Sequence, residues 1–412
     1  MHWPGPDRRR WSKGSRTANV TEMVVVNEGR SLRPADPVWA ISARWRRALA
    51  APRTIFEALF FVLLPLTAPA MIVAYLAGSY HPKPGVVDGT YFPDGGFLFD
   101  LHVMWKAGHD VVTGHSPFPF VYPAPAAFLM APFGALPWSV AVVAFTLALV
   151  LALVLTLRLL EVRDWRCYAA ALAALPMASS IMIGTLSPFL ALAAAAAWRY
   201  RDRRWVVATA IALAVVTKIF LWPLAIWLVA TRRLRSAVTT VVLGIALLMG
   251  SWGLLGFSGL LDYPHRLGRV AGLEQDKSYS PFALFRALGM TTGSARVALV
   301  ALTIVVIAGI VAVARGKDGD RRSFVVALLA GLVLSPIVWL HYLVVLIVPV
   351  ALYRPRLGAA WLIPLAFWFF PGQENHGSAR NIVLMFALTA VTLALAIWQG
   401  RQRAPLPALS SP

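Results

Sequence analysis

One acidic side chain, Asp100, is placed in this 412-residue sequence where it could do chemistry. It opens a segment whose apolar residues, from Leu101 to Val112, recur at helical spacing, which predicts an amphipathic helix with Asp100 at its head. A partly desolvated carboxylate is a stronger base than one in water and can take a proton from a hydroxyl group. Asp100 is therefore our candidate catalytic base. The structural alternative is that Asp100 caps the helix.

Cations and aromatic residues are expected on the same side of the protein as Asp100. Cations suit a phosphate group, and aromatic rings suit the face of a sugar. The candidates for substrate binding are Lys218, Arg266, Arg269, Lys277, His341, Trp339 and Tyr122. Several have a plainer interpretation: Lys218 can extend to a membrane surface, Arg266 and Arg269 can be solvated loop charges, and His341 and Trp339 can pack at an interface.

The elements that position these residues are predicted to be transmembrane helices. Hydrophobic residues make up 59% of the chain and charged residues 14%, against about 25% charged in a globular domain. A bilayer is crossed by about 20 apolar residues, and the apolar runs predict an all-α polytopic bundle of about twelve spans. These cover 56–78, 138–160, 167–183, 187–198, 205–217, 219–231, 236–257, 294–314, 323–340, 341–353, 357–371 and 381–399.

The net charge of +20 reflects orientation rather than binding of nucleic acid. Most of the 38 Lys and Arg residues fall on one side of the predicted topology, which is typical of the cytoplasmic side of a membrane protein, where they contact anionic lipid. The organisation predicted is a basic cytoplasmic tail at 1–54, a membrane domain at 55–400 and a cytoplasmic tail at 401–412. The membrane domain holds a first outer loop at 79–137, which carries Asp100 and interfacial helices, and a second outer loop at 258–293.

Five short motifs follow one another along the chain. They are Asp100 with Gly114, Tyr122-Pro123-x-Pro125, Pro132 and Leu136-Pro137; Gly184-x-x-Ser187-Pro188; Lys218 with Pro223 and Arg232-Arg233; Ser278 with Pro281-Phe282; and Ser335-Pro336-x-x-Trp339-x-His341-Tyr342. In this order they resemble glycosyltransferase family 87, of the GT-C class, over roughly residues 56–400. The sequence departs from that family at Thr185, where an amide is usual, at Asp276-Lys277-Ser278, and at Tyr342, where a second His is common.

The resemblance implies an enzyme of the plasma membrane that uses a polyprenyl-phosphate sugar. It implies a GT-C helix bundle with its active site on the outer face and both termini in the cytoplasm. Asp100 would be the base of a direct, inverting displacement on the sugar. Mannose is the donor sugar expected first and arabinofuranose the alternative, and the acceptor would be a cell-envelope glycolipid or polysaccharide. No cofactor is expected and no metal-ligating residues are identified, with a divalent metal left open.

Two other functions and one other motif fit parts of the sequence. A transporter or flippase for a lipid-linked sugar would share the spans, although polar residues near the midplane would be expected of it. An inactive protein that only binds glycolipid is the other rival. The Asp318-Gly319-Asp320 segment resembles the Asp-x-Asp metal motif of nucleotide-sugar enzymes, but it falls in a short cytoplasmic turn, and we expect no metal there.

Overall fold

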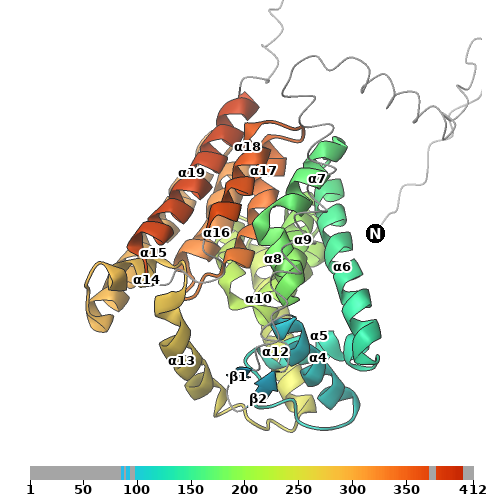
Figure 1. Ribbon diagram of the computed structural model, residues 1–412. Helices are drawn as coiled ribbons and strands as arrows, with labels where there is room; N and C mark the ends of the chain where they lie inside the picture. Colours follow the sequence, from blue (N-terminus) through green and yellow to red (C-terminus); the bar gives the residue numbers. More distant parts are fainter. Residues whose placement is uncertain (1–84, 88–89, 93–97, 371–376, 402–412) are drawn as a thin grey trace, which may run out of the picture. The chain divides into compact units, whose positions relative to one another are not determined.

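The computed structural model of the chain describes residues 85–87, 90–92, 98–370 and 377–401 (Figure 1). All of these belong to the second of two compact units, which starts at Leu59. The predicted tail at 1–54, the predicted first span at 56–78 and the tail beyond Arg401 lie outside the described residues. The described chain is helical apart from one short hairpin, in which Val86 pairs with Tyr91.

The elements follow in sequence order from the hairpin to the last long helix. The first half holds β1 (Gly85–Val87), β2 (Thr90–Phe92), α4 (Phe99–Val112), α5 (Ala124–Gly134), α6 (Trp138–Leu159), α7 (Trp165–Ala173), α8 (Leu175–Ile183), α9 (Ser187–Arg199), α10 (Arg204–Thr217), the 3-10 turn η2 (Ile219–Leu221) and α11 (Pro223–Ala230). The second half holds α12 (Leu234–Leu254), α13 (Tyr263–Glu274), η3 (Gln275–Lys277), α14 (Pro281–Ala287), α15 (Thr292–Ala314), α16 (Gly319–Leu334), η4 (Leu340–Leu346), α17 (Ile347–Tyr353), α18 (Ala359–Leu362), η5 (Ile363–Phe369) and α19 (Ala379–Arg401).

Four of these helices, α6, α12, α15 and α19, are long and apolar enough to cross a membrane. The α7–α8 pair would be a fifth span, bent by 60° before Pro176, whose ring removes a backbone donor and disfavours helix at the preceding residue. The other predicted spans within the described residues are shorter helices or helix pairs. The protein is therefore a multi-pass helical membrane protein, and the count of twelve stays a prediction.

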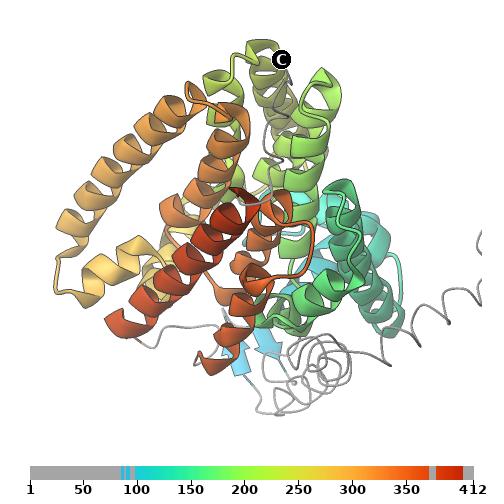
Figure 2. The same ribbon diagram turned by 90° about the horizontal axis from the view of Figure 1, so that it is seen from above.

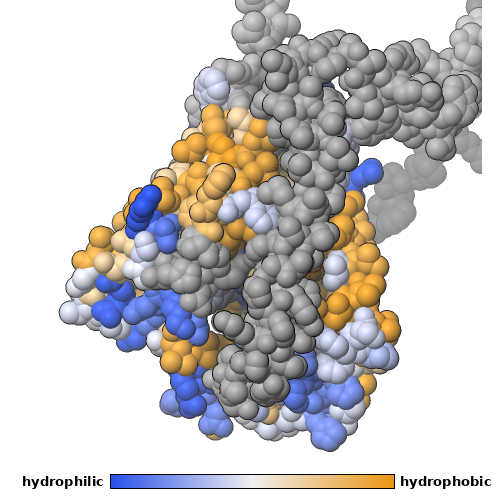
Figure 3. Space-filling model, viewed as in Figure 1, coloured by the Kyte–Doolittle hydropathy of each residue, from blue (hydrophilic) through white to orange (hydrophobic). Residues whose placement is uncertain are grey.

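The lipid-facing character of the long helices is visible on their surfaces. Val143 and Leu147 on α6 are 59% and 63% exposed, and Val297 on α15 is 70% exposed. Hydrophobic residues cover the sides of the bundle near α6 and α19 in Figure 3, while hydrophilic residues gather at the end near α4 and α13. The helix α15 lies at the margin of the bundle (Figure 2). Apolar surface of this extent belongs against lipid.

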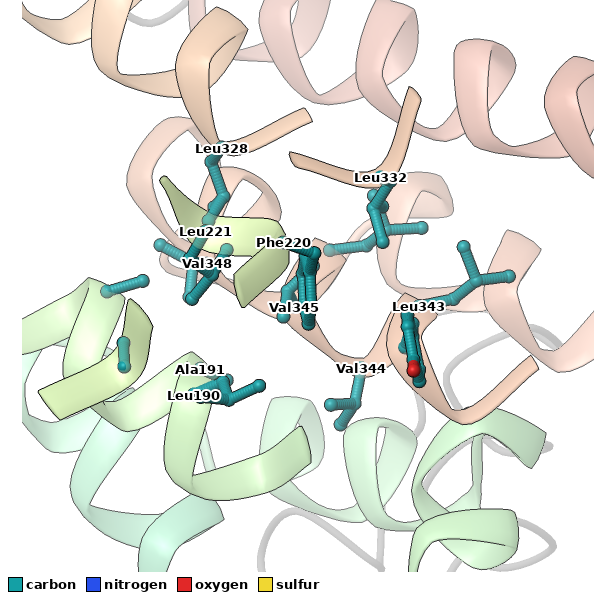
Figure 4. Packing of buried hydrophobic residues seen from close by; sticks show 14 of the residues in the cluster. Leu190, Ala191, Phe220, Leu221, Leu328, Leu332, Leu343, Val344, Val345 and Val348 are labelled. Atoms are coloured by element: carbon teal, nitrogen blue, oxygen red, sulfur yellow. The ribbon is translucent and has the colours of Figure 1, made fainter. Parts of the chain in front are cut away.

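A buried hydrophobic core joins the shorter helices. Leu190 of α9, Leu221 of η2, Leu328 of α16 and Val345 of η4 are each at most 2% exposed and pack together (Figure 4). On α16, Gly331 brings the helix close to η2, because a Cβ there would lie 2.6 Å from the carbonyl oxygen of Phe220. This contact fixes the break between α10 and α11.

The predicted amphipathic helix is confirmed as α4, and the first part of its apolar face is buried in the protein, while Val112 near its end is 52% exposed. Leu101, Met104 and Ala107 are fully buried. α4 packs on α5 through two glycines, since a Cβ on Gly108 would collide with the backbone of Met130. The second, Gly134 of α5, would collide with the backbone at Gly108 and His109 in the same way.

One carboxylate, that of Asp320, links several helices through hydrogen bonds. Asp320, at the start of α16, accepts hydrogen bonds from Arg233 at 2.7 and 2.9 Å, from Arg201 at 3.0 Å and from the indole of Trp227 at 3.1 Å. Asp318 pairs with Arg321, three residues along. Asp320 is thus occupied as a link between α9, α11, α12 and α16.

Replacing Gly108 by Ala should destabilise the protein by about 1–3 kcal/mol, because the added methyl overpacks the α4–α5 contact. The control is Gly268→Ala on α13, where nothing lies within 4 Å of the added Cβ, and helix propensity alone should leave stability unchanged or slightly higher. Thermal unfolding in detergent measures both. Equal melting temperatures for the two variants would contradict this account of the contact.

Asp320→Asn should lower stability by about 1–3 kcal/mol, a range that allows for the 34% exposure of Asp320. The matched variant is Asp318→Asn, which removes one exposed ion pair and should change stability by less than about 0.5 kcal/mol. Asn also tolerates the left-handed backbone at position 318, where φ is 58°. If both variants behave alike in a melting experiment, the four-helix link is wrong.

Candidate active site

Asp100 lies in the first turn of α4 and is partly buried. Its Oδ2 accepts a hydrogen bond of 3.0 Å from the hydroxyl of Tyr122. Leu98, with φ 53°, occupies the N-cap position without a side-chain hydrogen bond. Asp100 is therefore not the N-cap residue of α4, and its carboxylate accepts its hydrogen bond from the Tyr-Pro-x-Pro turn.

Lys218 stands at the break between α10 and η2, in an extended backbone conformation. Its side chain does not extend to the surface, since the residue is only 9% exposed. The ammonium Nζ lies 3.9 Å from the ring centroid of Tyr342 and 5.8 Å from that of Tyr122. Both distances suit cation–π attraction, so the two rings hold the charge between them.

Tyr342 is positioned by its neighbours on η4 and η2. Its ring stacks on Phe220 at 5.0 Å between centroids and contacts His341 edge-on at 4.8 Å. His341 is buried, with 3% of its surface exposed. Trp339 is partly buried and packs against the core. The carbonyl oxygen of Trp339 accepts a hydrogen bond from the backbone N–H of Tyr342. Thus the Trp-x-His-Tyr motif presents its Tyr to Lys218, and Trp339 lies behind it.

The turn between α8 and α9 supports the start of α4. Gly184, with φ 74°, lies so close to Leu101 that a Cβ would collide with it. The backbone N–H of Leu98 donates to the carbonyl of Met182 at 2.7 Å. Thr185, which replaces an amide of the family motif, is buried and bonds Ser187 through both hydroxyls at 3.1 Å. The turn therefore positions the start of α4, the helix that carries Asp100.

The electrostatics of Asp100 are a balance of burial and partners. Desolvation raises the pKa of Asp100, while the positive charge of Lys218 and the hydrogen bond from Tyr122 lower it, and the net shift is upward. Burial and the Asp100 carboxylate raise the pKa of Tyr122 well above its usual value, so the phenol stays protonated and donates. Within the described chain, no ion pair joins Lys218 directly to Asp100.

The predicted second outer loop reaches this site through Tyr263 at the start of α13. Its hydroxyl donates to the carbonyl of Val121 at 3.1 Å, next to Tyr122 in the chain. The Tyr263 ring also contacts Phe118 and Trp252 edge-on. Further along, the N–H of Tyr279 donates to Val338 at 2.7 Å, which joins the Asp276-Lys277-Ser278 stretch to the segment before Trp339.

The cations of the second loop are not brought against Asp100 by any described contact. Arg266 is partly buried on α13, Arg269 is exposed on the same helix, and Lys277 is exposed and pairs with Glu274 at 3.7 Å. Their roles stay predictions. Among the cations named from the sequence, Lys218 is the one whose charge acts on Asp100.

Sequence reasoning missed two aromatic contributions. Tyr342 is not among the candidate site residues predicted from the sequence, although its place beside His341 in the last motif was the available signal. No sequence pattern pointed to Tyr263. In the described part of the chain, no group of three or more His, Cys, Asp or Glu side chains could hold a metal ion.

Comparisons with known proteins point to one enzyme family. The model of "Glycosyltransferase family 87" matches residues 120–339. The chain is 26% identical, over 82% of both chains, to the polyprenol-phosphate-mannose-dependent alpha-(1-2)-phosphatidylinositol pentamannoside mannosyltransferase of Mycolicibacterium smegmatis. It is 28% identical, over 71% of both chains, to the protein of the same name from Mycobacterium tuberculosis. No solved structure matches significantly. Because the family match covers more than half of the chain, the protein belongs to glycosyltransferase family 87.

Proposed function

We propose that this glycosyltransferase moves mannose from a polyprenyl-phosphate donor to a hydroxyl group of a glycolipid acceptor, with Asp100 as the base. The observation that carries the proposal is the meeting of Asp100, Tyr122 and Lys218 at one end of the bundle. The two mycobacterial relatives, whose names state a polyprenol-phosphate-mannose donor and a phosphatidylinositol mannoside acceptor, support the choice of substrates.

The proposed reaction is one direct displacement. The Asp100 carboxylate takes the proton of the acceptor hydroxyl as its oxygen attacks the anomeric carbon. The bond from that carbon to the phosphate oxygen breaks, polyprenyl phosphate leaves with the electron pair, and the anomeric configuration inverts. The raised pKa of Asp100 makes it a better base than a solvated Asp. The hydrogen bond from Tyr122 fixes the carboxylate for the attack.

Lys218 is proposed to hold the phosphate. Its ammonium is desolvated between two aromatic rings and is not neutralised by contact with Asp100. A buried cation attracts an anion more strongly than a solvated one. In this role Lys218 would bind the donor phosphate and offset the charge that develops as it leaves. Because the charges of Lys218 and Asp100 attract each other, the phosphate at Lys218 and the base would lie in one site.

The proposed orientation places this site at the outer face and both termini in the cytoplasm. The turn that contacts α4 starts α9, which ends at Arg199, next to the Asp320 network. A helix of that length puts the network roughly 20 Å from the site. The arginines of the network then lie on the cytoplasmic side, where basic residues are enriched. Twelve spans, with the first at 56–78, would complete this topology.

Asp100→Asn should lower the rate of mannose transfer by at least about a hundredfold, because an amide cannot accept the proton. Transfer of labelled mannose from polyprenyl-phosphate mannose to envelope glycolipid, at equal protein level, measures it. The control is Asp110→Asn on the same helix, which loses only an exposed ion pair with Lys106. Full activity in Asp100→Asn would refute the proposed base. Transfer from polyprenyl-phosphate arabinose alone would keep the base and change the sugar.

Tyr122→Phe should shift the acid limb of the pH–rate profile to higher pH. The hydrogen bond from Tyr122 lowers the pKa of Asp100, so its loss raises that pKa and the base is protonated at a higher pH. The profile of kcat/KM against pH measures the shift in the free enzyme. Tyr263→Phe is the control, since it removes a nearby hydroxyl that bonds a backbone carbonyl. A profile in Tyr122→Phe that is lower but unshifted would contradict the assignment.

A further inference from the structure

The starts of α10 and α12, with the turns before them, carry more positive charge than nearby carboxylates neutralise. Arg201 and Arg233 donate hydrogen bonds to Asp320 at 3.0 and 2.7 Å. Arg233 also donates to Asp202 at 3.1 Å. Four more arginines of these segments are exposed and make no ion pair with any residue that the structure describes: Arg203, Arg204, Arg232 and Arg235. Positive charge that is unmatched in this way attracts an anion.

Two of the four arginines come together on one face of α12. The Nε of Arg204 donates to the hydroxyl of Thr239 at 2.6 Å, which brings this guanidinium across from α10 onto α12. Thr239 lies four residues after Arg235, and side chains at that spacing are neighbours on a helix surface. Cζ of Arg204 also lies 5.1 Å from the ring centroid of Trp205, which is 62% exposed. Two planar guanidinium groups placed in this way suit a phosphate, which each can bind through two hydrogen bonds.

The same face of α12 continues as an apolar stripe. Its residues follow Arg235 at helical spacing, and each is at least 39% exposed: Val238, Val242, Ile245 and Met249. At 1.5 Å per residue the stripe from Val238 to Met249 is about 16 Å long. Half of a hydrocarbon core of about 30 Å is about 15 Å. The stripe therefore matches one acyl chain of one leaflet.

We propose that this face of α12 binds an anionic phospholipid, with its phosphate between Arg204 and Arg235 and an acyl chain along the stripe. The proposed orientation puts this end of the bundle in the cytoplasm, where anionic lipids make the leaflet surface negative. The site lies beyond the candidate active site, because α10 separates Arg204 from Lys218 by roughly 20 Å. It therefore does not depend on the proposed sugar transfer.

Other occupants fit this face less well. A soluble anion would use the two arginines but would leave the apolar stripe without a role. A phospholipid with a choline head group brings a second cation next to the arginines, so its net attraction to them is weaker. An anionic lipid such as phosphatidylglycerol matches both the charge of the arginines and the apolar surface beside them.

The test reads the lipid next to Val238 directly. The one native cysteine, Cys167, is fully buried, so a thiol-reactive fluorophore can be directed to the full-length protein through Val238→Cys. The labelled protein is placed in phosphatidylcholine vesicles, and lipid with a nitroxide on its acyl chain is added as the quencher. Each arginine near an anionic lipid contributes about fivefold in affinity, so phosphatidylglycerol should quench at a roughly thirtyfold lower mole fraction than phosphatidylcholine.

Substitution of the arginines should remove this preference. Arg204→Gln with Arg235→Gln should bring the two lipids close to parity. Because Arg204 also bonds Thr239, Arg235→Gln alone is the second variant, and it should lower the preference about fivefold while keeping the wild-type melting temperature. Unchanged preference in either variant would overturn the proposal.

A matched position on α15 separates a specific site from general attraction to a basic surface. Ala312 is exposed and precedes the exposed Arg315 by three residues, just as Val238 follows Arg235 by three. A fluorophore attached through Ala312→Cys should show a weaker preference for phosphatidylglycerol, and Arg315→Gln with Lys317→Gln should leave the signal at Val238 unchanged. Equal preference at the two positions would overturn the proposal. Loss of the preference on adding inorganic phosphate at constant ionic strength would do so too, because it would assign the arginines to a soluble anion.

Discussion

A charged carboxylate that is partly buried must be stabilised by partners, and the structure supplies two for Asp100. Tyr122 donates a hydrogen bond and Lys218 contributes a positive charge, and together they offset part of the cost of desolvation. The three residues belong to α4, to the turn before α5 and to the end of α10. Each residue must be held in place by its own element. The helices and turns around the site therefore keep Asp100, Tyr122 and Lys218 within reach of one another.

The supports are places where helices break or approach closely. The break after Thr217 frees Lys218 from a helix and turns it inward, and Gly331 of α16 lets η2 sit close enough to keep that break in place. Gly184 packs closely against Leu101, and Gly108 packs closely against the backbone of α5. Irregular backbone within an apolar protein is tolerated only where other protein groups satisfy it. Such breaks next to polar side chains are therefore a marker of the site.

The two ends of the bundle use charge differently. At one end, Asp320 is paired with two arginines and an indole, and its charge is used to hold four helices together. At the other end, the charge of Lys218 acts on Asp100 without an ion pair between the two side chains.

The sequence by itself determined the membrane class, the family, the helix that carries Asp100 and the long helices α6, α12, α15 and α19. These follow from composition, helical periodicity and ordered motifs, which are local properties of the chain. It could not give the partner of the Asp100 carboxylate or the direction of the Lys218 side chain, because each depends on residues more than twenty positions away. Only the tertiary structure placed Tyr342 over Lys218, Tyr263 against Val121 and Asp320 among its arginines. The physical reason is that hydrogen bonds and charge interactions act through space, at distances that helix packing alone decides.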